Sequence, residues 1–520
     1  MAQSHPRYRF GPLERRGLIA GWRGGQIASV VAGLVVAIAM LHGRPSVEEI
    51  LAAVAAVAAG VAFAWWPVAG RSGEEWLPVV VRWCASGGAT RRRWRSGVPL
   101  AGHCIGPDRA PCLVAKGEQG RLTKTGDRAP ARAGAPQTAR APAGRRGGVF
   151  CGLDVLGARL PEGAGALGVV RDARAGTYTA ALSVIGHNFA LLGPDEKERR
   201  VASWASVLTS LARDHSVLHR LQWIASTVPD GGAAVVEHLD TNGVLPAGAV
   251  ARRSYMTLLV SAGAATCRHE VLLAVQVRAA GAAGRAMRAL GGGDAGACAV
   301  LGRELGSLQR QLGGADIQVD RALDARALAG VVRRAIAGAD AGRACPPCGV
   351  GWPWPLSSEV EWGCLRTDEA WHATYWIAEW PRVDVGPEFL GPLLLGSTRR
   401  SVAVVMEPIA PSRAVRQAER ARTADIADAE LRRRGGFLST ARRAREAELA
   451  SRRETELADG HASFRFSGYV TVTALDKAEL TAACDATEQA ASQCRLELRR
   501  LYGDQERAFT CTLPLGRGLA

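Results

Sequence analysis

Two uncharged apolar runs near the N-terminus constrain this chain more than any other feature of its sequence. The first covers residues 24–43 and the second covers residues 50–70. Each is about long enough to cross the ~30 Å hydrocarbon core of a bilayer as a helix. The first run begins too late for a signal peptide, and a second run follows it at once. A buried hairpin of a globular protein is the alternative, since the second run is Ala-rich and weakly hydrophobic. The pattern favours a transmembrane helical hairpin over residues 24–70.

Arginines on both sides of the hairpin indicate its orientation. Five precede the first run and six follow the second, whereas the connecting loop holds only Arg44. The positive-inside rule therefore predicts a multi-pass plasma-membrane protein with both termini in the cytoplasm, including a basic N-terminus at residues 1–23. Aromatic residues at the ends of the runs are typical of interfacial anchors: Trp22, Trp65, Trp66 and Trp76.

The region after the hairpin remains basic. Residues 71–100 are predicted to form a juxtamembrane helix, in which residues 75–84 are amphipathic and residues 91–95 carry four arginines. This segment either lies on the inner leaflet near anionic lipid or is an ordinary solvated helix. Residues 101–149 have no hydrophobic period and are rich in Gly, Pro, Ala and Arg, which predicts a disordered basic linker.

The charge distribution bears on the class of partner. The chain has 520 residues and a net charge of +16, with only four lysines. Residues 1–100 account for +7 and residues 101–150 for +6, whereas the remaining 370 residues are nearly balanced at +3. A nucleic-acid-binding domain would concentrate the excess on a folded face. We therefore expect no direct sequence-specific binding of nucleic acid.

From residue 150 onward, strand and helix patterns alternate. Predicted strands lie at 167–170, 177–185, 219–226, 271–277, near 317, and at 371–380, 402–407, 466–473 and 496–499. Predicted helices lie at 194–213, around 246–260, and at 298–312, 322–337 and 477–491. Short strands alternating with helices, together with antiparallel hairpins, indicate an α+β fold built from ferredoxin-like βαβ modules. Residues 150–410 form the cytosolic domain, and residues 460–520 complete it.

Residues 411–459 differ from the domain on either side of them. They are charged and Ala-rich, with Arg and Glu three or four positions apart, which favours solvated helices. Gly435 and Gly436 are expected to break the segment into two helices of a hairpin. The result is a helical arm, which is either a plain solvated projection or a partner-binding element.

The search for catalytic motifs is negative. None of the lysines follows a glycine, so the phosphate-binding loop of P-loop ATPases is absent, and neither HExxH nor GxSxG occurs. Asp214, His215 and His219 have helical metal-ligand spacing but run into a strand. Cys345 and Cys348 form a CPPC motif in a Gly/Pro-rich loop, with only Cys364 and His372 nearby, so reduced thiols are favoured over a redox or zinc site. We expect no enzyme and no catalytic, cofactor-binding or metal-binding residues.

Three segments resemble components of secretion machines. The two-span N-terminus is similar to PrgI-like and VirB-type membrane subunits of conjugation systems. Residues 177–223, which begin TYTAALSVIGHNF, resemble the N-terminal non-ATPase domain of VirB-type ATPases. Residues 466–516, which begin FSGYVTVTALDKAEL, resemble an actinobacterial family of two-span membrane proteins from type IV secretion-like loci. The linker and the CPPC loop depart from that pattern.

The resemblance implies a membrane-anchored scaffold of a type IV secretion or conjugation apparatus. Such a scaffold docks a separate VirB-type ATPase and other membrane subunits within an oligomeric complex. The alternative is a type VII secretion membrane component of the EccE kind, which also has two N-terminal spans and a cytosolic domain. An enzyme with an unrecognised site is the third hypothesis, which a cleft of convergent ionisable groups would support.

Overall fold

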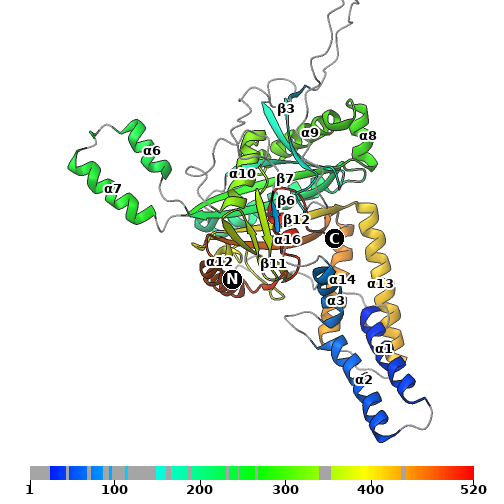
Figure 1. The fold of residues 1–520 in the computed structure, drawn as a ribbon. Coiled ribbons are helices and arrows are strands. Elements are labelled where there is room, and N and C mark those ends of the chain that lie inside the picture. The colour runs from blue at the N-terminus through cyan, green and yellow to red at the C-terminus, as the bar shows by residue number, and fades with distance from the viewer. Residues whose placement is uncertain are drawn as a thin grey trace, which may run out of the picture.

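The computed structural model shows a sheet-based body from which two helical hairpins and a membrane-type hairpin project (Figure 1). It describes residues 24–42, 46–66, 72–85, 93–95, 112–114, 148–159, 165–185, 189–229, 233–243, 245–246, 248–263, 267–338, 353–434 and 441–519. The N-terminal part contains α1 (Gly24–Met40), α2 (Val47–Trp65), α3 (Gly73–Ala85), β1 (Arg93–Arg95), β2 (Cys112–Val114) and β3 (Leu153–Arg159).

The body contains two modules that share a β-α-β-β-α-β core with a helical hairpin inserted between the second and third strands of that core. The first consists of β4 (Ala166–Asp172), β5 (Thr177–Ile185), α5 (Pro194–Leu211), β6 (Leu218–Pro229), α6 (Ala233–Asn242), α7 (Val250–Gly263), β7 (Cys267–Arg278), α8 (Gly281–Ala289), α9 (Gly293–Gly314), β8 (Gln318–Ala322) and α10 (Ala325–Ala337). The second consists of β9 (Ser357–Val360), β10 (Leu365–Thr367), β11 (Ala370–Glu379), α12 (Gly391–Leu394), β12 (Arg400–Ile409), α13 (Pro411–Arg434), α14 (Ala441–Ala458), β13 (Ser463–Ala474), α15 (Lys477–Gln493), β14 (Glu497–Arg500) and α16 (Gln505–Phe509). Short 3-10 turns lie at Phe189–Leu191 and Thr510–Thr512.

The described strands form one 14-stranded sheet whose two halves mirror each other in strand order. In the first half the order is β8-β5-β7-β6, and in the second half it is β14-β11-β13-β12. Both are the order of a β-α-β-β-α-β ferredoxin-like module, in agreement with the predicted α+β class. The halves meet where β6 and β12 pair antiparallel, from Arg400 opposite Thr227 to Met406 opposite Leu221. The sheet therefore has a pseudo-two-fold relation centred on this pair.

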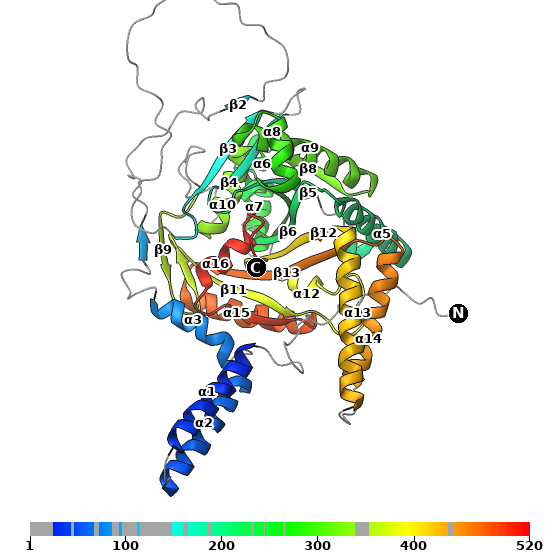
Figure 2. The ribbon, with the colours of Figure 1, turned by 90° about the vertical axis from the view of Figure 1, so that its right-hand side faces the viewer.

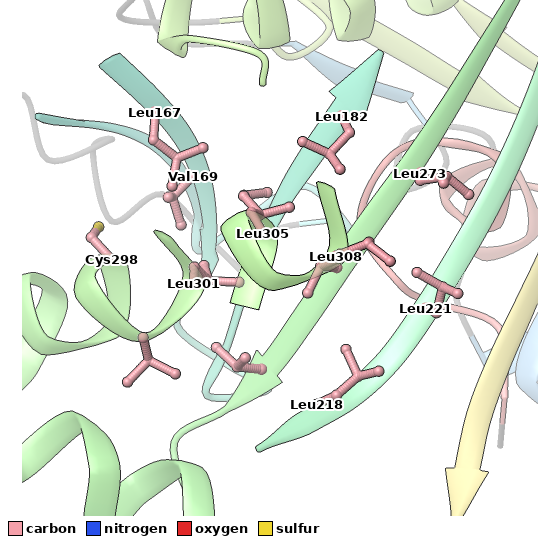
Figure 3. Close-up of a cluster of buried hydrophobic side chains, with 14 of the residues drawn as sticks. Leu167, Val169, Leu182, Leu218, Leu221, Leu273, Cys298, Leu301, Leu305 and Leu308 are labelled. Carbon is pink, nitrogen blue, oxygen red and sulfur yellow. The ribbon is translucent and has the colours of Figure 1, made fainter. Parts of the chain in front are cut away.

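Helices cover both faces of the sheet because the central strands are apolar on both sides. On one face, α9 places Leu301, Leu305 and Leu308 at helical spacing against strands β4 to β7 (Figure 3). The equivalent helix of the second module, α15, packs on the same face against β11, β12 and β13. The opposite face is covered by α10, α16 and the C-terminal segment, in one cluster that includes residues of both modules. The body is thus a three-layer structure.

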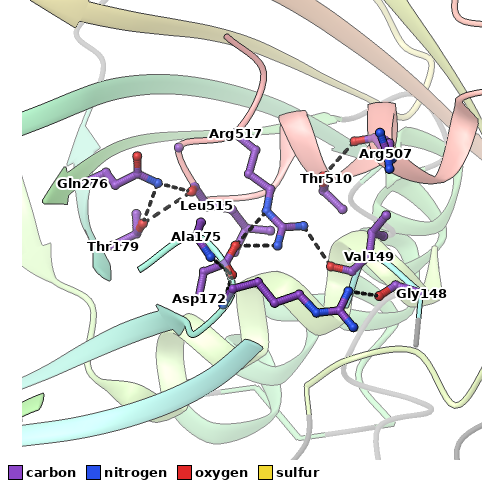
Figure 4. Close-up of polar contacts among 12 residues, drawn as sticks. Gly148, Val149, Asp172, Ala175, Thr179, Gln276, Arg507, Thr510, Leu515 and Arg517 are labelled. Atoms are coloured by element: carbon purple, nitrogen blue, oxygen red, sulfur yellow. Dashed lines mark hydrogen bonds and ion pairs between the residues drawn. The ribbon is translucent and has the colours of Figure 1, made fainter. Parts of the chain in front are cut away.

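The C-terminal segment, residues 510–519, holds the two modules together across that second face. Gln222 of β6, which is fully buried, donates from Nε2 to the carbonyl oxygens of Cys511 and Leu513 at 2.8 and 2.9 Å. Gln276 donates to the carbonyl of Leu515 at 2.7 Å, and the Arg517 guanidinium pairs with Asp172 at 2.6 Å (Figure 4). These bonds satisfy polar groups that would otherwise be buried without partners.

Most predicted elements of the body are present, with shifted ends. The predicted helix around 246–260 is α7, and the predicted strand at 219–226 is the longer β6. Elements that the sequence did not predict are β1, β3, β9, β10, α6, α8, α12 and α16; β1 lies within the predicted juxtamembrane helix 71–100. Within the predicted linker 101–149, residues 112–114 form β2, which pairs in parallel with β3, and residues 148–149 are also described. The rest of that prediction, and Cys345 and Cys348, lie outside the described residues.

Candidate membrane anchor and arm

Helices α1 and α2 form the predicted hairpin, and local sequence explains where the second helix begins. Ser46 caps α2, since its Oγ accepts from the amide of Glu49 at 3.3 Å while the Glu49 carboxylate accepts from the Ser46 amide at 2.8 Å. This reciprocal pair is a capping box. It fixes the polar turn at the far end of the hairpin.

Large apolar side chains cover the outside of the hairpin. Ala53 and Ala64 are the buried residues of α2, whereas the exposed ones include Ile50, Leu51, Val54, Val61 and Phe63, together with Val31, Leu34, Val35, Val36 and Ile38 of α1. A continuous exposed apolar surface of this kind marks a contact with lipid or with another protein.

One helix in the described part of the chain, α2, is long and apolar enough to cross a membrane, by length and composition alone. It has 19 residues and a mean hydropathy of 1.9, whereas the apolar stretch Gly25–Met40 of α1 is shorter. At 1.5 Å per residue α2 extends for roughly 28 Å, close to the thickness of the hydrocarbon core. The prediction of two spans therefore stays a prediction for α1.

Small residues allow the two helices to approach each other closely. A Cβ added to Gly60 would lie 2.9 Å from the carbonyl oxygen of Ser29 and 3.4 Å from the Cα of Gly33. Small residues at the contact are typical of helix pairs within membranes. One turn further along α2, Gln26 Nε2 donates to the carbonyl of Ala64 at 3.3 Å.

Helix α3 connects the hairpin to the body. Trp362 stacks on Trp76 with 5.7 Å between ring centroids, and the edge of Trp83 meets Trp362 at 5.3 Å. Tyr502 stacks on the same Trp362 at 6.3 Å, and Arg82 pairs with Asp504 at 2.7 Å. These aromatic contacts and this ion pair fix α3 on the second module.

The docking of α3 changes two sequence-based interpretations. Residues 75–84 belong to a helix that packs on the body through Trp76 and Trp83, so it is not an ordinary solvated helix. Its contact with the inner leaflet stays a prediction, and Leu77 and Val81 remain exposed. Trp76, predicted as an interfacial anchor, contacts Trp362 and Tyr502 instead. Arg93 lies in β1, which pairs with β9, and its guanidinium binds Glu359 at 2.7 Å. Nothing near residues 75–95 in the sequence signals these partners, which are more than 260 residues away.

Helices α13 and α14 form the predicted arm, and the two helices lie side by side as they leave the body (Figure 2). Near the base, Ala414 is buried and Ser412 donates to Asp214 at 2.9 Å. Along the shaft, Arg422 of α13 forms an ion pair with Glu454 of α14. Hairpin α6–α7 occupies the equivalent place in the first module, between β6 and β7, and points away from the arm (Figure 1).

The candidate metal residues do not converge in the structure. Asp214 accepts from Ser412 at the base of the arm, and His215 takes a left-handed backbone conformation with φ of 65°. Burial and the charge of Arg220 lower the pKa of His219. Across the described residues there is no group of three or more His, Cys, Asp or Glu that could hold a metal ion.

Cys364 and His372 likewise have structural partners. The Cys364 thiol donates to Glu361 at 3.3 Å, and burial together with this contact raises its pKa to about 12. His372 is fully buried between the hydroxyls of Thr367 and Thr473, at 2.6 and 2.9 Å. Burial lowers the pKa of His372 to about 3, so the imidazole is neutral in the folded protein.

Ionisable groups with shifted pKa values occur at several places in the body, and Tyr178, Arg171 and Cys298 all lie beside Asp294. Burial and a hydrogen bond to Asp294 raise the pKa of Tyr178 to about 12, and burial raises the pKa of Glu506. Glu407 is half-buried, which opposes ionisation, yet the hydrogen bond and charge of Arg465 lower its pKa. The Tyr178 hydroxyl donates to Asp294, and Glu407 forms an ion pair with Arg465. Structural ion pairs and hydrogen bonds also shift pKa values in this way.

Residues 265–377 match the family model of EccE. That family is described as a putative type VII ESX secretion system translocon component. No curated protein matches the chain. The matched stretch runs from β7 of the first module to β11 of the second, about a fifth of the chain, and contains neither α1–α2 nor the arm.

The match favours one of the two secretion hypotheses at a coarse level. EccE is a family of secretion-system membrane components, which agrees with the exposed apolar hairpin. It supports the type VII alternative and gives no support to the PrgI-like or VirB-like type IV interpretation. Because the similarity covers only part of the body, the topology and the partners are matters for proposal.

Proposed function

We propose that this chain is a non-enzymatic, membrane-anchored subunit of a type VII secretion translocon. The observation that carries the proposal is the EccE match within the body. It is supported by a hairpin whose large apolar side chains are exposed and which α3 holds against the body. Its partners are the other membrane subunits of the translocon and the secretion ATPase that the complex contains.

In this proposal α1 and α2 both cross the membrane, and both ends of the hairpin face the cytoplasm. Arginines before α1 and after α2 favour this orientation, since the connecting turn holds one arginine. The body, which follows α3, is then cytoplasmic. The protein neither binds nor hydrolyses ATP, because the sequence has no Gly-Lys phosphate-binding loop.

Purification of the full chain from its native membrane tests the assignment. We expect type VII membrane subunits and an FtsK-like ATPase to co-purify in detergent. Recovery with a VirB-type ATPase, or as a monodisperse monomer without partners, would contradict the proposal. Stoichiometric binding of ATP to the purified chain would overturn its non-enzymatic part.

Cysteine labelling at Ser46 tests the topology separately. A thiol at this turn should react with a membrane-impermeant reagent from outside the cell, whereas a thiol at Arg93 should not. Ala58→Asp should impair insertion, because a charge at mid-membrane costs about 2.5–3.5 kcal/mol. Ala424→Asp, at an exposed position of the arm, is the matched control.

A further inference from the structure

The charges of the arm are strongly segregated along its length. Between Glu430 and Glu446 the sequence has six arginines and no acidic residue. The rest of residues 411–459 carries six arginines and nine acidic residues. We call the first group the arginine tip; its members are Arg432, Arg433, Arg434, Arg442, Arg443 and Arg445.

The fold places all six arginines at the same end of the arm. Three belong to the last turn of α13, which ends at Arg434, and three belong to the first turns of α14, which begins at Ala441. The first turn of α14 has no acidic residue, although acidic side chains are the ones that a helix N-terminus stabilises. Arg434 pairs with Glu430 at 2.9 Å, yet its side chain is 75% exposed. The tip is therefore a concentrated positive charge, at the point of the arm farthest from the body.

The arm points in the direction of the proposed membrane. In both views the α13–α14 hairpin and the α1–α2 hairpin leave the body on the same side (Figures 1 and 2). α13 has 24 residues, so the tip stands roughly 36 Å from the start of that helix. Clusters of four to eight Lys or Arg on the cytoplasmic side of a span are typical of binding to anionic lipid headgroups.

We infer that the arginine tip binds the anionic headgroups of the membrane into which the α1–α2 hairpin inserts. The inference rests on the proposed anchoring of that hairpin. It gives the body two contacts with the bilayer, the hairpin beside α3 and the tip at the end of the arm. Two separated contacts with the membrane restrict the tilt of the body more than the hairpin alone does.

Amide hydrogen exchange of the full chain in lipid nanodiscs tests the inference. One set of discs contains phosphatidylcholine alone, and the other contains phosphatidylcholine with about 30% phosphatidylglycerol. We expect exchange over residues 431–445 to be several-fold slower in the anionic discs. The difference should disappear at 0.5 M NaCl, where charges beyond a few ångströms are screened.

Two variants with equal changes of net charge provide the control. The tip variant replaces all six arginines of the tip by Gln and should lose the difference between lipids. The shaft variant replaces six arginines of the same arm by Gln and should keep it: Arg413, Arg416, Arg420, Arg422, Arg452 and Arg453. Equal exchange of the unmodified chain in both lipids, or the same loss in both variants, would overturn the inference.

The discs contain no other translocon subunit, so the result does not depend on whether the complex co-purifies. Failure of the hairpin to insert is detected by flotation with vesicles of the same two compositions. Tip-dependent flotation with anionic vesicles would still support the lipid contact in that case. Slowing of exchange by a single-stranded oligonucleotide, but not by phosphatidylglycerol, would assign the tip to nucleic acid and refute the inference.

Discussion

At the scale of single residues, a glycine is required where the backbone of a neighbouring segment leaves no room for a Cβ. Gly168 in β4 lies against the turn before α10: its amide donates to the carbonyl of Leu323 at 2.8 Å. An added Cβ would lie 2.6 Å from the backbone carbon of Asp324. Gly157 sits directly opposite Gly168 in β3, and there an added Cβ would meet only the Cβ of Ala325, at 3.7 Å.

This pair makes a matched test. Gly168→Ala should lower the free energy of unfolding by about 1–3 kcal/mol, because β4 and α10 must move apart. Gly157→Ala should leave the free energy of unfolding unchanged or raise it by up to about 1 kcal/mol, because alanine lowers the conformational entropy of the unfolded chain. Urea unfolding of the two variants in the same detergent measures the difference. Similar losses in both would show that the contact at Asp324 is not the cause.

His372 gives a pH-dependent prediction. The Thr367 hydroxyl donates to the carbonyl of Ile336, so His372 Nε2 donates to Thr367 and Nδ1 accepts from Thr473. The folded pKa is about 3, below the unfolded value near 6.5. As the pH falls, His372 takes up a proton in the unfolded chain before it does so in the folded protein. The contribution of His372 to the free energy of unfolding is therefore complete above pH 6.5 and is lost as the pH drops toward 3.

Between pH 7 and pH 5 this one group should remove about 2 kcal/mol from the free energy of unfolding. His372→Asn should reduce the loss over that interval by the same amount, because Asn does not titrate there. Unfolding curves of both proteins at pH 7, 6 and 5 measure the two slopes. An equal dependence of the free energy of unfolding on pH in both proteins would mean that the pKa of His372 is the same in the folded and unfolded states.

At the scale of secondary-structure elements, we expect the arm to be dispensable for folding. β12 and β13 pair from Arg400 opposite Val472 to Ile409 opposite Ser463, independently of the helices between them. Deleting residues 417–456 and joining the ends with a short Gly/Ser turn should therefore leave a folded chain whose melting temperature changes by a few degrees. Secretion should fail. A large loss of stability would show that the arm belongs to the core.

The same scale shows why the sequence predicted some elements and not others. α9 and the arm were evident from helical periodicity, and β11 and β12 from short apolar runs. α3 was predicted as a helix, but its partners Trp362 and Tyr502 come from a distant part of the chain, so local pattern gave no reason to expect docking. β9 and β10 have four and three residues, which is too short for a clear period.

At the scale of the whole molecule, the two modules depend on each other. Alternation of strands and helices was enough to predict ferredoxin-like units, but it could not show that β6 and β12 join them into one sheet. Gln222 illustrates the difficulty: a polar residue in a buried strand has no local explanation until Cys511, Leu513 and Gly516 are seen to bind its amide. The C-terminal segment thus belongs to both modules.

The module boundary therefore offers a test of this dependence. Residues 1–343 and 344–520 can be expressed as two chains that divide the protein between α10 and β9. Among the described strand pairs, only β1–β9 and β6–β12 then join the two fragments, and every other pair lies within one fragment. The contacts of the C-terminal segment with β4, β6 and β7 also join them. Each fragment alone exposes a long edge strand, which favours aggregation. Together they should bind through β6–β12 and through the pairing of Arg517 with Asp172, and so purify as one complex.

The control fragment pair carries Gln222→Leu, which leaves the carbonyls of Cys511 and Leu513 and the amide of Gly516 without their buried partner. Each unsatisfied buried group costs about 1–3 kcal/mol, so this pair should associate at least tenfold more weakly. Size-exclusion chromatography and titration of one tagged fragment with the other measure both effects. Two monodisperse fragments that do not bind each other would mean that the modules fold independently and that the seam between β6 and β12 is not what unites the sheet.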